Sequence, residues 1–144
     1  MTRTCPHPTS EMTTATTEQD AVASDAVALA DRFAAVRARS RALAATIGPE
    51  DAQLQSMPDA SPAKWHLAHT SWFFEQFALG ADADYVPVDA DWAYLFNSYY
   101  EAVGDRHARA RRGVLSRPTL AQVLAHREVV DARMHDMLLE PLPP

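Results

Sequence analysis

The sequence contains little cysteine, little glycine and no excess of positive charge. Cys5 is the single cysteine, and four residues are glycine. One cysteine cannot form a disulfide within the chain, which is typical of proteins from the reducing cytoplasm. The formal net charge is −6, so binding to nucleic acid or to an anionic membrane has no overall electrostatic support. We therefore predict a cytoplasmic protein that binds neither.

Two kinds of hydrophobic segment are also missing. No stretch approaches the roughly 18 apolar residues of a membrane-spanning helix. Residues 1–20 lack the apolar region of a secretory signal and are rich in polar residues and proline, so we predict a disordered N-terminal tail there. The whole chain has 144 residues, 47% hydrophobic and 22% charged, which is typical of one globular domain. We place this domain at residues 21–144.

Apolar residues recur at three- and four-residue steps in three segments, which predicts three long helices. They span residues 24–47, 62–80 and 120–140, and no segment has the alternating period of a strand. Part of the aromatic connection between the last two, near residues 92–103, is expected to be helical as well. An up-down bundle contains four helices, so a fourth is missing or comes from elsewhere. The buried stripe of the first helix is predicted to contain Val22, Ala26, Leu29, Phe33, Val36, Leu43 and Ile47.

The helix ends carry recognisable signals. Ser61 is predicted to cap the second helix, with Pro62 at its first position. Thr119 and Gln122 are spaced as a capping box for the last helix. We therefore expect both starts to be well defined.

Histidines on the second helix could bind a metal. His66 and His69 are three residues apart, and neutral imidazole is a common ligand of iron and zinc. Two histidines beside tryptophans are more often simply packed, so both interpretations stay open at this point. His126 and His135 are nine residues apart on the last helix, which puts them on opposite sides, where they cannot share one metal.

Arginines cluster in the second half of the long connection. Arg109 and Arg112 are three residues apart, so in a helical turn they would point the same way. Such a pair can hold a carboxylate or a phosphate through charge-assisted hydrogen bonds. The alternative is a solvated basic loop. No nucleophilic triad, phosphate-binding loop or dinucleotide fingerprint is present.

Three ordered blocks of the sequence resemble one family. The first runs from Gln55 to Thr70 and continues from Trp72 to Glu75, the second runs from residue 94 to 104, and the third from 112 to 119. Together they resemble the EgtB family of ergothioneine biosynthesis, a group of iron-dependent sulfoxide synthases. The resemblance implies an all-α, DinB-like up-down helical bundle, joined in that family to a C-terminal domain like the formylglycine-generating enzyme.

The family resemblance also implies a reaction and a site. Family members use non-haem iron(II) and O₂ to join a thiol, cysteine or γ-glutamylcysteine, to hercynine, and a close relative makes the selenium analogue. His69 matches one of the three histidines that hold the iron, whereas His66 matches a neighbour. The other two ligands belong to a His-x-x-x-His on the fourth helix, which nothing here matches. Arg109 and Arg112 match the arginines that bind the carboxylate of the thiol substrate.

The resemblance leads to an expectation about completeness. We expect residues 21–144 to be a C-terminally truncated bundle that does not hold Fe²⁺ alone and is inactive by itself as a sulfoxide synthase. Its uncovered apolar faces predict self-association or pairing with a separately encoded C-terminal half. Two alternatives are a stand-alone helical module that binds a small thiol or a partner protein without catalysis, and a DinB-type thiol transferase.

Overall fold

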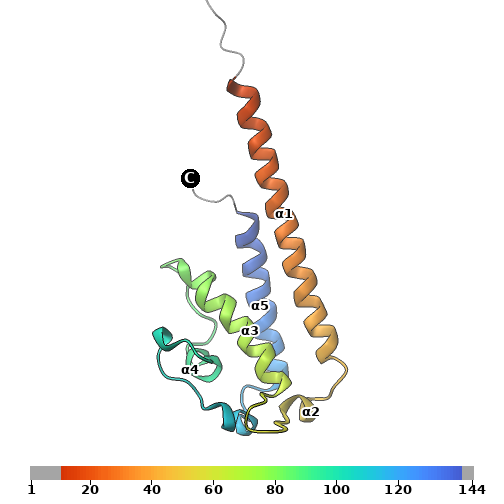
Figure 1. Cartoon of the computed structure of the whole chain (residues 1–144), viewed down its shortest axis with the longest axis vertical. Coiled ribbons are helices and arrows are strands. Elements are labelled where there is room, and N and C mark those ends of the chain that lie inside the picture. The colour runs from red at the N-terminus through yellow and green to blue at the C-terminus, as the bar shows by residue number, and fades with distance from the viewer. Residues whose placement is uncertain (1–10, 141–144) are drawn as a thin grey trace, which may run out of the picture.

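The computed structural model describes residues 11–140, with side chains from residue 21 onward, and the regular elements of this part are helices joined by turns and loops (Figure 1). No strand occurs among the described residues, which confirms the predicted all-α class. The three long helices are α1 (Glu11–Ala44), α3 (Ala63–Phe77) and α5 (Leu120–Leu139). The shorter elements are α2 (Pro49–Gln53), η1 (Leu79–Ala81), α4 (Trp92–Phe96), η2 (Glu101–Val103) and η3 (Arg109–Val114).

Helix α1 begins earlier than the sequence pattern predicted. It starts at Glu11 rather than near Ser24, so the second half of the predicted disordered tail is helical. Residues 1–10 of that tail, and residues 141–144, lie outside the described part of the chain. Three- and four-residue apolar steps could not reveal this extension, because it consists largely of Thr, Glu and Ala.

The predicted caps have different outcomes. The capping box of α5 is confirmed: the Thr119 side chain accepts from the Gln122 amide at 3.2 Å, and the Gln122 side chain accepts from the Thr119 amide at 2.8 Å. The predicted Ser61 cap of α3 is wrong, because Pro62 occupies the N-cap position and no side chain caps the helix. The Ser61 hydroxyl instead accepts a hydrogen bond from Arg112, 2.8 Å away.

Helix α5 packs against both α1 and α3 (Figure 1). Seven buried side chains from α3, α4 and α5 form the main core, and a smaller cluster lies further along α5 around Val130 and Met134. Between them, charged groups join the three long helices. Arg37 of α1 binds Asp131 of α5 at 2.6 Å and the Ser71 hydroxyl of α3 at 2.9 Å.

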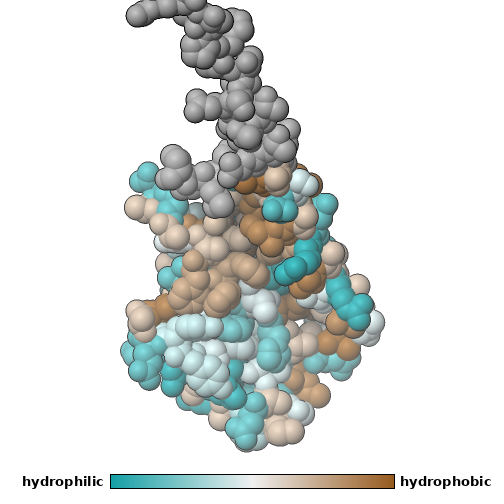
Figure 2. Space-filling view, turned by 45° about the horizontal axis from the view of Figure 1, so that its top comes forward, coloured by the Kyte–Doolittle hydropathy of each residue, from teal (hydrophilic) through white to brown (hydrophobic). Residues whose placement is uncertain are grey.

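The predicted buried stripe of α1 is partly wrong. Four of its members are at least half exposed: Val22 at 51%, Leu29 at 50%, Val36 at 60% and Leu43 at 64%. The helix is rotated so that Ala30 and Arg37 are buried, because Arg37 satisfies its charge at the contact with Asp131. Apolar side chains therefore remain on the surface of the described bundle. Figure 2 shows several patches of hydrophobic residues on one face of the described part of the chain.

The connection between α3 and α5 folds back beneath α3. Trp92 and Phe96 of α4 are buried in the main core, so the expected helical part near residues 92–103 is confirmed as two short helices, α4 and η2. Asn97 fixes the turn after α4, since its amide donates to the carbonyls of Tyr100 and Gly104 at 3.0 and 3.1 Å. Gly104 has a positive φ of 112°, which favours glycine there.

Candidate functional site

The His69 ring is held in one orientation on α3. Its Nδ1 lies 2.7 Å from the carbonyl oxygen of Phe96. A carbonyl only accepts, so Nδ1 carries the proton and the lone pair of a neutral ring lies on Nε2. The ring stacks on Trp65 at 4.6 Å and on Trp72 at 5.5 Å between centroids. A bond from one ring nitrogen to a backbone carbonyl is the usual way to orient a metal-binding histidine.

The surroundings favour the neutral form of His69. Burial lowers its pKa, and the positive charges of Arg112 and His66 lower it further, while the bond to the Phe96 carbonyl opposes them. The pKa of His66 is also lowered, by desolvation and by Arg112 and Arg109. Neutral imidazole is the form that binds a metal ion. Charge and geometry therefore prepare His69 as a ligand.

Arg112 is a buried cation with no carboxylate partner among the described residues. It is 3% exposed, and its guanidinium lies 3.4 Å from the centroid of the Trp65 ring. It donates to the hydroxyls of Ser61 at 2.8 Å and Ser98 at 3.4 Å. Burial, Arg109 and Arg106 lower its pKa to about 10. A buried charge without a counter-ion is costly, which makes this position attractive to an anion.

Arg109 lies one turn before Arg112 on η3, and its guanidinium is 4.8 Å from the Tyr99 ring centroid. Gln55 holds η3 in place through the Gly113 amide at 2.6 Å and the Arg109 carbonyl at 2.9 Å. A Cβ on Gly113 would lie 2.7 Å from the Cβ of Gln55, so a side chain does not fit there. The conformation of η3 is thus fixed by Gln55, which is distant from it in the sequence.

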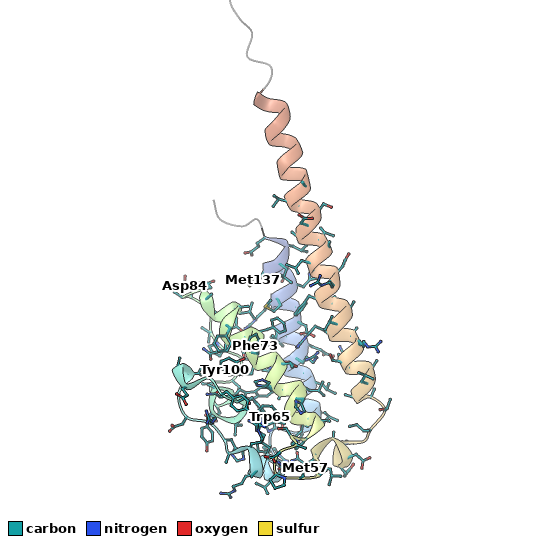
Figure 3. The ribbon with its side chains drawn as sticks, viewed as in Figure 1. Met57, Trp65, Phe73, Asp84, Tyr100 and Met137 are labelled. Carbon is teal, nitrogen blue, oxygen red and sulfur yellow. The ribbon has the colours of Figure 1, made fainter. Side chains whose placement is uncertain are left out.

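The structure brings three of the sequence-predicted residues to one region. His69 and Arg112 share the Trp65 ring, and Arg109 is close enough to Arg112 to lower its pKa. Figure 3 shows Trp65, Phe73 and Tyr100 where α3 faces the connection. Within the part of the chain that the structure describes, no three His, Cys, Asp or Glu side chains form a group able to hold a metal ion. The role of His69 as a metal ligand therefore stays a prediction.

The sequence reasoning missed a second buried group, the pair of Glu75 on α3 and His126 on α5. Glu75 accepts a hydrogen bond from His126 at 3.0 Å, and His126 stacks on Trp92 at 3.8 Å. Glu75 also accepts from the Tyr85 hydroxyl and from the Val88 amide, both at 2.8 Å. The packed His126 and the exposed His135 confirm that these two do not share a site. The available signal for Glu75 was that it is the single acidic residue of α3.

A cavity of about 180 Å³ lies beside this pair. Trp72, Glu75 and Tyr85 are among its lining residues. Neither His69 nor the two arginines line it. The predicted site residues are therefore not gathered around this cavity.

Three helices with a long folded connection, and a histidine and arginines on one side of α3, define a helical bundle with a candidate ligand site. A sequence profile of the DinB superfamily matches residues 32–141. The chain belongs to the DinB superfamily. No curated protein matches the chain. Among the described residues, no helix is long and apolar enough to cross a membrane.

Proposed function

We propose that this DinB-like domain is the N-terminal part of a non-haem iron(II), O₂-dependent sulfoxide synthase that joins a thiol to hercynine in ergothioneine biosynthesis. The proposal rests on the resemblance to the EgtB family. The observation that supports it best is the paired arrangement of His69 and Arg112. One offers an unprotonated Nε2, the other a buried positive charge, and both contact Trp65.

The described residues have distinct roles in this proposal. His69 binds iron through Nε2 while its Nδ1 proton stays on the Phe96 carbonyl. Arg112 and Arg109 bind the carboxylate of cysteine or γ-glutamylcysteine, which leaves the thiol directed away from them. Bound iron would supply the activation of O₂. An open iron site needs about three protein ligands, so the remaining ligands are proposed to come from a partner segment.

The uncovered apolar side chains of α1 agree with such a partner segment. Leu29, Val36 and Leu43 are spaced by seven residues and are at least half exposed. A seven-residue apolar repeat is typical of a helix that packs against another helix. A helix on this side of the bundle would cover that apolar surface. A separately encoded half or a second copy of the chain would serve the same purpose.

A second candidate function depends on Arg112 alone. A stand-alone DinB-like module would bind a small anionic thiol at Arg112 without catalysis. Arg112 favours this alternative because its attraction for an anion does not depend on iron. Sequencing the source locus past the Pro144 codon discriminates the two functions. A continuing reading frame with a His-x-x-x-His helix favours the synthase, and a stop codon there, with no neighbouring frame that supplies the helix, favours the module.

The biochemical test compares this chain with the product of the entire reading frame. Under anaerobic conditions, calorimetry with Fe²⁺ should show stoichiometric binding by the entire product and none of useful affinity by the chain alone. With hercynine, O₂ and either thiol, mass spectrometry should detect a sulfoxide. His69→Ala should lower iron affinity at least 10- to 100-fold, and His135→Ala, on the exposed side of α5, should not. Tight stoichiometric iron binding by the chain alone would overturn the incomplete-site proposal.

A further inference from the structure

Four side chains form one continuous stack along α3 and η3. The Arg112 guanidinium lies 3.4 Å from the Trp65 ring centroid, Trp65 lies 4.6 Å from His69, and His69 lies 5.5 Å from Trp72. The Trp65 and His69 rings are nearly parallel, with 14° between their planes. Trp65 thus touches both His69 and Arg112.

The stack is fastened to the end of α4. The last carbonyls of a helix have no partner within it. Here three successive ones accept hydrogen bonds from outside: Tyr94 from the His107 amide at 3.0 Å, Leu95 from Trp65 Nε1 at 3.2 Å, and Phe96 from His69 Nδ1 at 2.7 Å. Trp65 and His69 are therefore set against adjacent carbonyls of one short helix. Their relative position does not depend on a loop side chain.

We propose that Trp65 is the positioning residue of this site, which sets the His69 imidazole and the Arg112 guanidinium relative to each other. The inference rests on the proposed function and adds a residue to it. A metal-bound thiol whose carboxylate is held by an arginine needs a fixed distance between the metal ligand and the cation. Sites of this kind tolerate errors of only about 0.5 Å. The Trp65 indole is held in place by its hydrogen bond to the Leu95 carbonyl, so it can fix the distance between His69 and Arg112.

The geometry of Trp65 differs from that of an ordinary core residue. Trp92 belongs to the same core cluster and is equally buried, at 4% exposure against 3% for Trp65. Trp92 stacks on His126, which Glu75 already binds. Trp65 instead contacts two groups for which the described residues provide no ionic partner. Trp92 is therefore a matched control for loss of an indole from the core.

The test reads the state of His69 directly, without iron or activity. In the chain labelled with ¹⁵N-histidine, imidazole shifts should show His69 with its proton on Nδ1. In Trp65→Leu, the ring loses its stacking partner and can turn away from the Phe96 carbonyl, so the Nε2-protonated form, which imidazole prefers in water, should gain population at the expense of the Nδ1-protonated form. Exchange of the Arg112 Nε–H with solvent should also become faster. Trp92→Phe should leave both signals unchanged while lowering the melting temperature.

Trp65→Phe keeps the test decisive if Trp65→Leu does not fold. The phenylalanine retains an aromatic face but cannot donate a hydrogen bond to the Leu95 carbonyl. The shift in the His69 tautomer and the faster exchange of the Arg112 Nε–H should therefore appear, but to a smaller extent than in Trp65→Leu. Unchanged His69 and Arg112 signals in folded Trp65 variants would overturn the positioning role, as would equal changes in Trp92→Phe. Control of the His69 tautomer by Trp65, with no sulfoxide from the entire reading frame, would overturn the proposed function alone.

Discussion

Two groups of buried polar residues on and around α3 are satisfied in different ways. The Ser71 hydroxyl accepts from Arg37 of α1 at 2.9 Å, and the Glu75 carboxylate binds His126 of α5 at 3.0 Å and the Tyr85 hydroxyl of the connection at 2.8 Å. Toward the connection, His69 uses one ring nitrogen, and Arg112 has hydroxyl partners but no carboxylate among the described residues. Buried polar groups in proteins are almost always paired. Glu75 therefore has three hydrogen-bond donors, whereas Arg112 has no carboxylate partner among the described residues.

The comparison also separates two kinds of buried charge. Glu75 has hydrogen-bond donors from α5 and from the connection, so its negative charge is fully used inside the fold. Arg112 keeps a net positive charge, and its Nε has no hydrogen-bond partner among the described residues. Removing the first charge should damage the fold, whereas removing the second should damage only binding. Substitutions at Glu75, His69 and Arg112 therefore test this distinction.

The largest effect is expected at Glu75. Glu75→Ala leaves His126 buried without its carboxylate and removes the acceptor of the Tyr85 hydroxyl. Removing one partner of a buried pair typically costs about 3–5 kcal/mol. Urea unfolding followed by circular dichroism should show a loss of this size. His135→Ala, in an exposed position on α5, should change the free energy of unfolding by less than about 0.5 kcal/mol. Equal losses would contradict the structural role of Glu75.

The same carboxylate predicts how stability depends on pH. Burial would raise the pKa of Glu75, but the hydrogen bonds from His126, the Val88 amide and Tyr85 outweigh it, so the pKa is lowered from 4.5. The stabilisation is therefore complete above about 4.5 and disappears as the pH falls through the lower pKa of the folded state. Unfolding measured on both sides of that range should show this loss. Glu75→Gln should flatten the dependence, and an unchanged slope would exclude Glu75 as its source.

A smaller effect on stability is expected at His69. His69→Ala removes the bond to the Phe96 carbonyl and two stacking contacts. Loss of one buried hydrogen bond and its packing should lower the free energy of unfolding by about 1–2 kcal/mol. The loss should be clearly below that of Glu75→Ala in the same urea experiment. A loss as large as that of Glu75→Ala would assign His69 to the structural side of the comparison.

Arg112 should show the opposite behaviour from Glu75. Arg112→Met replaces a buried cation that lacks an ionic partner with an apolar side chain of similar length. Such a replacement is often neutral or stabilising, so unfolding should change by less than about 1 kcal/mol. Cysteine binding, followed by calorimetry or by chemical shifts, should be lost. A strongly destabilised variant would show that the two serine contacts make Arg112 a structural residue.

The fold was largely predictable because its signals are local. The capping box at Thr119 depends on four consecutive residues, and the three long helices depend on apolar periodicity. The rotation of α1 was not predictable in this way. Helix α1 has more apolar residues than one face can bury. Which face is buried depends on the ion pair between Arg37 and Asp131, which are 94 positions apart in the sequence.

The candidate site was predictable only in part. The family motifs and their spacing pointed to His69, Arg109 and Arg112, and the structure places them in one region. The shared stack on Trp65 was not visible, because it requires η3 to return beside α3. Ser61 shows the same limit. Its position before Pro62 predicted a helix cap, but the guanidinium of Arg112 arrives from a distant turn and binds its hydroxyl instead.

The smallest effect is expected on the outer surface of α1. Val36 is 60% exposed, so Val36→Gln removes little buried apolar area and should change the free energy of unfolding by less than about 0.5 kcal/mol. Ala30 lies on the buried face of α1 and is 1% exposed, so it is the matched control: Ala30→Gln must displace neighbouring side chains and should lower the free energy of unfolding by about 1–3 kcal/mol.

A partner helix that covers Leu29, Val36 and Leu43 would change the result. Val36→Gln should then weaken association, measured by sedimentation of the product of the entire reading frame or of this chain mixed with a separately encoded C-terminal half. A stable fold with weaker association would separate the surface that α1 uses within this bundle from the surface it offers to a partner. A large loss of stability in the chain alone would mean that Val36 is already buried in solution, for instance by self-association, and dilution would then reduce the difference between the variant and the wild type.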